Sequence, residues 1–188
     1  MNIYEREINN FRQLNKVANT NGVVLFGSSF AKNIPVCELK QSFDIDCDIY
    51  NRSITDLSVF DAEALLEDCV TALAPKTVLI QLGETDLERG FHTIPEIVES
   101  YEKIVAKLKA ADKHCDIVII SVCESAFTIH PDELNKQLEL AAKKMKCKYA
   151  DISSAFSNDS PGVKAFSLLS FFMQNDISFF DVMKMVHV

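Results

Sequence analysis

The sequence predicts an α/β fold of three layers, in which helices cover both faces of a five-stranded parallel sheet. Short runs rich in valine and isoleucine alternate with longer segments of helical periodicity along the chain. Such runs are typical of parallel strands, which are buried on both faces of the sheet. The 188 residues fit five strand–helix units in a single domain over residues 1–188. A closed (β/α)8 barrel would need about 250 residues.

The chain is expected to begin with a helix and the first two strands. Apolar residues recur at helical spacing from Ile3 to Val17, and the pattern breaks at Asn19–Gly22. A buried strand over Val23–Phe26 follows and ends at Gly27. The next strand is predicted over Ile45–Tyr50, where the apolar pattern is mixed.

The middle of the chain contains the clearest strand. A helix is predicted over Phe60–Leu73, and Pro75 ends it. The uninterrupted apolar run in Thr77–Leu82 then predicts a strand that stops at Gly83. A proline and an acid in the first turn favour a long helix over Ile97–Ala110.

The last elements complete the sheet. Ile117–Ile120 is predicted to be a strand, Pro131–Met145 a helix and Lys148–Ile152 the final strand. In open parallel sheets the ligand site lies beyond the carboxyl ends of the strands. The loops that follow the strands are therefore the candidates for function.

Three polar loops follow the first three strands, at Gly27–Phe30, Asn51–Thr55 and Gly83–Asp86. Glycine permits a tight turn and a close approach of the backbone to a ligand. Because the strands are parallel, these loops are expected to converge at one edge of the sheet. Polar turns also simply end strands, so this feature alone does not establish a site.

The three loops resemble, in order and spacing, the first three sequence blocks of the SGNH (GDSL) hydrolases, which usually read GDS, NRGI and GxND. Leu134–Leu138 and Tyr149–Ile152 are similar to the fourth helix and fifth strand of that family. The resemblance covers most of the chain from about Gly22 onward. It implies a flavodoxin-like, SGNH hydrolase-like sheet and a serine ester hydrolase that acts on a small acyl ester.

By this resemblance Ser29 stands where the family has its nucleophile. A serine hydroxyl needs a base that accepts its proton, and the family supplies one in a DxxH motif near the C-terminus. Here the corresponding stretch keeps the acid, Asp176, but has Phe179 in place of the histidine. Phenylalanine accepts no proton. His130, on the expected site edge, and His187, eleven positions beyond Asp176, are the candidate replacements.

The remaining histidines and loop acids have simpler interpretations. His92 is expected at the same edge of the sheet, and His114, which precedes its strand, at the opposite end. For each histidine a solvated or structural role competes with a catalytic one. Glu84 and Asp86 are expected to accept hydrogen bonds from loop amides and not to exchange protons with a substrate.

The resemblance also implies an altered oxyanion hole. Its donors would be the amide of Ser29, the amide of Ser53 in place of a glycine, and the hydroxyl of Thr85 in place of an asparagine. Loss of one such donor typically costs about 3 kcal/mol of transition-state stabilisation. Loss of the general base costs more, so the missing histidine is the more serious departure.

Three functions remain open on the sequence alone. The first is the serine ester hydrolase. The second is a non-catalytic descendant of the same fold that binds a small ligand or a partner protein. The third is a flavodoxin-like binder of phosphate or nucleotide at Gly27–Ser29, which no GxGxxG or Walker pattern supports.

Composition excludes several classes of partner. The formal net charge of -8 argues against nucleic acid, whose phosphates need a basic surface. Acids at Glu5 and Glu7 occupy the place of a signal peptide's basic segment, so a cytoplasmic location is expected. The longest uncharged stretch, Ala165–Asn175, is too short for a bilayer, which needs about 20 residues.

No metal or cofactor is expected. The cysteines form no CxxC or zinc pattern and are expected to be reduced and mostly buried. The phenylalanine- and leucine-rich segment from Phe166 to Phe180 is expected to form core or a contact between two copies of the chain.

Overall fold

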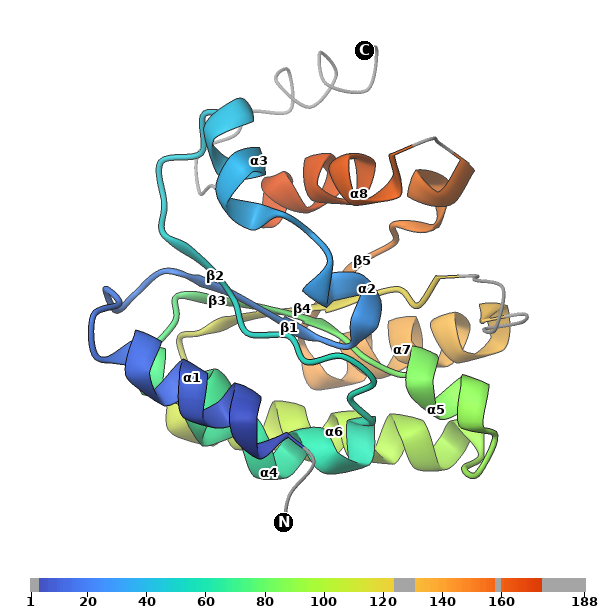
Figure 1. Ribbon diagram of the computed structural model, residues 1–188. Coiled ribbons are helices and arrows are strands. Elements are labelled where there is room, and N and C mark those ends of the chain that lie inside the picture. The colour runs from blue at the N-terminus through green and yellow to red at the C-terminus, as the bar shows by residue number, and fades with distance from the viewer. Residues whose placement is uncertain (1–3, 124–130, 158–159, 174–188) are drawn as a thin grey trace.

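A five-stranded parallel sheet forms the centre of the computed structural model, which describes residues 4–123, 131–157 and 160–173 (Figure 1). The strand order is β2-β1-β3-β4-β5, and every neighbouring pair is parallel. The predicted fold class is therefore confirmed. The strands are β1 Val23–Gly27, β2 Ile49–Asn51, β3 Thr77–Gln81, β4 Asp116–Ile120 and β5 Lys148–Ala150.

Alternate residues of each strand point to opposite faces of the sheet, and each face has its own core. Val24 and Phe26 face one hydrophobic cluster, whereas Val23 and Leu25 face the other. Helices cover both faces, which explains why β1 is buried and apolar throughout (Figure 1).

The helices of the first face are α1, α4, α6 and α7, drawn below the sheet in Figure 1. Residues at helical spacing on each of them are buried against the strands. Their bounds are α1 Glu5–Asn15, α4 Val59–Cys69, α6 Ile94–Ala111 and α7 Asp132–Met145.

The second face carries α2, α3 and α8, drawn above the sheet in Figure 1. Phe166 of α8 is fully buried there, which confirms the core interpretation for this part of the phenylalanine-rich segment. Phe179 and Phe180 lie outside the described residues. The bounds are α2 Ser29–Lys32, α3 Val36–Ser42 and α8 Pro161–Leu169, with 3-10 turns at Ser153–Ser157 and Ser170–Phe172.

Two predicted elements differ most from the observed ones, and the final strand, predicted over Lys148–Ile152, ends at Ala150. The helix predicted over Phe60–Leu73 divides into α4 and a 3-10 turn, Thr71–Leu73, and then Ala74 adopts a left-handed conformation. The strand predicted over Ile45–Tyr50 is only β2. Ile45 is buried, but its amide bonds the carbonyl of Lys40 at the end of α3 and not a neighbouring strand.

The thiols and the helices add two observations. Cys69 and Cys123 are buried, Cys37 is exposed, and the other three cysteines are half-buried, so the prediction of mostly buried thiols is correct for only two.

None of the helices in the described part of the chain combines the length and the apolar character that a membrane crossing requires.

Candidate functional site

The three polar loops converge beside the central strand β1, as the sequence predicts. The chain passes from β1 to β2 on one side and to β3 on the other, so the loops after these strands are neighbours. The amide of Ile54 donates to the carbonyl of Gly27 at 3.0 Å. The hydroxyls of Ser28 and Thr85 are hydrogen-bonded at 2.8 Å.

Ser29 is the first residue of the short helix α2 and is partly exposed at this edge. Its hydroxyl donates to the Oδ1 atom of Asp56 at 3.1 Å, and its Oγ atom accepts from the amide of Asp56 at 3.0 Å. The backbone of Asp56 is in the left-handed region, with φ 55°. Tyr4 and Arg89 both donate to the Asp56 carbonyl at 3.3 Å. Asp56, which extends the second loop by one residue beyond Thr55, therefore contacts the Ser29 hydroxyl as both donor and acceptor.

Ser53 is completely buried and lies within its own loop. Its amide donates to the side-chain oxygen of Asn51 at 3.0 Å, and its hydroxyl donates to the carbonyl of Leu25 at 3.4 Å. The amide of Ser53 therefore already has an acceptor. The second-loop amide that contacts Ser29 is that of Asp56, three residues later.

Thr85 and Asp86 lie in α5, Glu84–Arg89, a helix that begins inside the third loop and was predicted only as a turn. Thr85 is buried, and its hydroxyl is engaged by Ser28. The carboxylate of Asp86 accepts from the Ser58 hydroxyl and, at 3.0 Å, from the amide of Val59. It thus supplies an acceptor for an amide in the first turn of α4, which has no partner within the helix. The expectation that Asp86 accepts a hydrogen bond from a backbone amide is confirmed.

Glu84 also accepts a hydrogen bond from a backbone amide, and its carboxylate is buried. Its Oε1 atom accepts from the amide of Phe30 at 2.9 Å, and its Oε2 atom accepts from the side-chain amide of Gln81 at 3.4 Å. Burial raises the pKa of Glu84 above that of an ordinary glutamate. The Oε1 atom of Gln81 is buried without a hydrogen-bond partner among the described residues. A neutral group at position 84 would fit these surroundings better.

Glu84→Gln should therefore stabilise the protein at neutral pH, by about 1 kcal/mol. The new amide can donate to Gln81 once the Gln81 amide rotates. Because the folded-state pKa of Glu84 is raised, its contribution to stability is complete below the unfolded-state pKa and is lost as pH rises through the folded-state pKa. Urea denaturation at pH 4.5 and 7 should show a smaller fall in stability for Glu84→Gln than for the wild type. An equal fall would contradict the prediction. Glu67→Gln on the exposed side of α4 is the control.

The histidines divide between described and undescribed residues. The His92 ring stacks on Phe60, with ring centroids 3.8 Å apart. His114 precedes β4 and lies at the opposite end of the sheet, as predicted. His130, Asp176 and His187 lie outside the described residues. Within the described part of the chain, the side-chain partner of the Ser29 hydroxyl is a carboxylate and not an imidazole.

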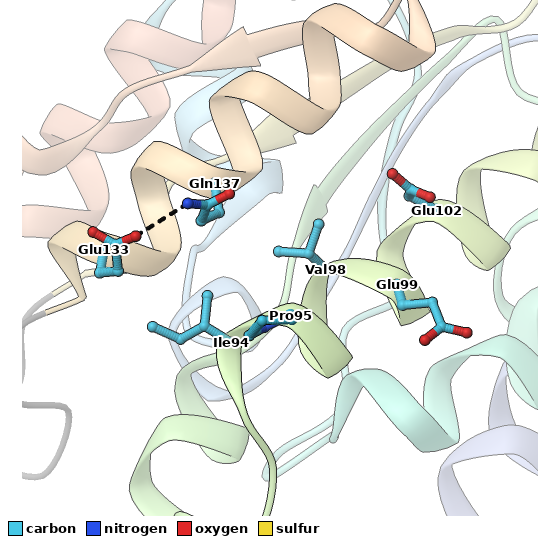
Figure 2. A pocket seen from close by; sticks show the side chains of 7 residues that line it. All are labelled: Ile94, Pro95, Val98, Glu99, Glu102, Glu133 and Gln137. Carbon is cyan, nitrogen blue, oxygen red and sulfur yellow. Dashed lines mark hydrogen bonds between the residues drawn. The ribbon is translucent and has the colours of Figure 1, made fainter.

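A cavity of about 570 Å³ lies elsewhere, between α6 and α7 (Figure 2). Ile94, Pro95 and Val98 give it an apolar side. The carboxylates of Glu99 and Glu102 are each paired with a lysine at 2.8 Å. None of its lining residues belongs to the three loops, so we place the candidate site by chemistry and not by cavity size.

The described residues also contain no group of three histidine, cysteine, aspartate or glutamate side chains that could hold a metal ion.

Solved structures provide the comparison with known proteins, because no family model and no curated protein matches the sequence. A Streptococcus pneumonia protein provisionally assigned as a platelet activating factor matches with a TM-score of 0.79 and 16% identity, over 90% of this chain and 92% of that one. A GDSL-like lipase from Bacteroides thetaiotaomicron matches with a TM-score of 0.69 and 13% identity, over 87% and 93%.

A third match is an acetyl-xylooligosaccharide esterase from Geobacillus, with a TM-score of 0.65 and 14% identity over 86% of this chain and 97% of that one. Catalytic mutants of the acetylxylan esterase from Geobacillus stearothermophilus, at a serine, an aspartate and a histidine, also match. At these identities the likeness establishes the fold. The chain has the SGNH/GDSL hydrolase fold that its three loop motifs imply.

Proposed function

We propose that this chain is a serine ester hydrolase that acts on a small acyl ester, with Ser29 as its nucleophile. The observation that carries the proposal is the placement of the Ser29 hydroxyl. It is partly exposed where the three loops meet, and the Asp56 amide lies 3.0 Å from its Oγ atom. The esterases and lipases among the structural neighbours support the same reaction class.

In the proposed reaction the Ser29 oxygen attacks the ester carbonyl carbon while its proton passes to a base. Negative charge then develops on the carbonyl oxygen, where backbone amides stabilise it. The Asp56 amide, which donates to the Ser29 Oγ atom before the reaction, would become one such donor once Ser29 attacks. The alcohol leaves with a proton from the base, and water releases the acid from Ser29 in the second half of the reaction. His130 or His187 would supply the base.

Ser29→Ala should lower the rate of p-nitrophenyl acetate hydrolysis by about a hundredfold, because water alone then attacks the ester. We expect a moderate effect because Ser53 and Thr85 already have partners, so the wild-type rate should be slow. Ser42→Ala, an exposed serine on α3, is the matched control. His130→Ala and His187→Ala identify the base. The histidine whose replacement lowers the rate as much as Ser29→Ala does is the general base. A rate unchanged by Ser29→Ala would show that Ser29 is not the nucleophile.

A second function, ligand binding without turnover, is favoured by a specific observation. The Ser53 amide and the Thr85 hydroxyl both have partners inside the protein. By the sequence resemblance, Phe179 also replaces the histidine base of the SGNH hydrolases. A thermal-shift screen with small acyl esters and their acids distinguishes the two functions. Saturable stabilisation by an ester that is recovered intact would support binding alone.

A further inference from the structure

The backbone at position 56 adopts a conformation that few residues other than glycine adopt. Asp56 has φ 55°, a region in which glycine is free of strain and in which aspartate is among the better tolerated other residues. The conformation brings both the amide and the carboxylate of one residue to the Ser29 Oγ atom, at 3.0 and 3.1 Å. A glycine here would offer the amide alone. The carboxylate is therefore an addition that the loop geometry does not require.

This carboxylate lies where the proposed reaction develops negative charge. Attack by Ser29 places charge on the carbonyl oxygen, which must lie close to the Oγ atom that forms the new bond. A carboxylate at 3.1 Å from that atom opposes the charge. The hydrogen bond from the Arg89 guanidinium goes to the Asp56 carbonyl and not to its carboxylate.

The hydrogen bond from Ser29 to Asp56 lowers the reactivity of Ser29, as the carboxylate charge does. It directs the Ser29 proton to Asp56, so a general base can take that proton only after this bond breaks. A carboxylate is a poor general base for a serine at neutral pH, because its affinity for a proton is far too low. The bond therefore stabilises the resting hydroxyl more than the reacting one.

We propose that the Asp56 side chain is an electrostatic brake that lowers the reactivity of Ser29, an inference that rests on the proposed hydrolase function. Asp56 thereby has two opposed effects at one site. Its amide favours the oxyanion, and its carboxylate disfavours it. Removal of the charge alone should activate the enzyme.

The test compares Asp56→Asn with the wild type. Asparagine keeps the size, the amide and the tolerance for a left-handed backbone, and removes the charge. We expect about a tenfold gain in the rate at which a fluorophosphonate probe labels Ser29, measured by intact mass. In that reaction the Ser29 oxygen bonds to phosphorus, fluoride leaves and the proton passes to solvent or base. The kcat for p-nitrophenyl acetate hydrolysis should rise while KM stays unchanged, because the charge acts on the transition state.

Asp61→Asn is the matched control. Asp61 is an exposed acid that accepts from the Tyr4 hydroxyl, which also contacts the Asp56 carbonyl. The asparagine oxygen can still accept from Tyr4, so the variant removes the same charge from the region and keeps this contact. Its labelling rate should stay within about twofold of the wild type. Asp56→Gly, which removes the same charge and suits the backbone, replaces Asp56→Asn if melting shows the latter unfolded.

The outcomes separate the two proposals. If the probe labels Ser29 in Asp56→Asn and Asp56→Gly no faster than in the wild type, the proposed brake is overturned. Ser29 would then remain the nucleophile. Absence of Ser29 labelling in the wild type and in both folded Asp56 variants would overturn the proposed function, and the brake with it. Equal gains in the Asp56 variants and in Asp61→Asn would assign the effect to overall charge and also overturn the brake.

Discussion

Replacing Gly27 with alanine should lower the free energy of unfolding by about 4 kcal/mol. Gly27 is the last residue of β1 and pairs with Gln81 of β3. A Cβ atom at this position would lie 2.3 Å from the Gln81 carbonyl oxygen and 2.7 Å from the Cβ atom of Ala31. The first contact is with backbone, which no side-chain rotation can relieve. The two strands must therefore move apart at the centre of the sheet.

Urea denaturation measures this effect, and Gly162→Ala is its matched control. Gly162 lies near the start of α8, and an added Cβ atom there meets nothing within 4 Å. Alanine in a helix should leave the stability equal or raise it by up to about 1 kcal/mol. Similar stabilities for the two variants would show that β1 and β3 adjust to the extra atom and that the close approach is not required.

Gly27 also illustrates what the sequence could and could not predict. Its place after an apolar run correctly marks the end of β1. The central strands β1, β3 and β4 could be located because they are buried and mostly apolar on both faces, whereas the edge strands β2 and β5 are less buried and shorter than predicted. The reason for glycine was predicted to be a tight turn or the approach of a ligand. The structure shows a close approach to Gln81, a residue far away in sequence. Such a constraint depends on strand register, which hydrophobic pattern alone does not supply.

The candidate site was predictable to the level of its loops but not of its contacts. Parallel strands imply that loops after β1, β2 and β3 share an edge, and the hydrogen bonds between them confirm it. The motif comparison directed attention to Ser53, whereas Asp56 is the residue that contacts Ser29. Asp56 follows no periodicity, and its left-handed backbone leaves no mark in the sequence. The short helices α2 and α5 were missed because each is too short to show a 3.6-residue period.

Tyr101→Phe should lower the free energy of unfolding by about 3 kcal/mol, although it removes a single oxygen atom. Tyr101 lies on α6 and is fully buried, and burial raises the pKa of its hydroxyl. That hydroxyl donates to the carbonyl of Leu82 and accepts from the amide of Leu82, both at 2.8 Å. Phenylalanine would leave both backbone groups without a partner, and each unsatisfied buried group costs about 1–3 kcal/mol.

Tyr50→Phe distinguishes this effect from the general loss of a tyrosine hydroxyl. The Tyr50 hydroxyl accepts from the amide of Asn19 at 2.9 Å, in an exposed position where water can replace it. Its loss should therefore cost less than about 1 kcal/mol. Equal losses in the two variants, measured by urea denaturation, would mean that water reaches Leu82 as well. A larger loss in Tyr101→Phe would indicate that α6 fixes the backbone from which Gly83 and the third loop begin.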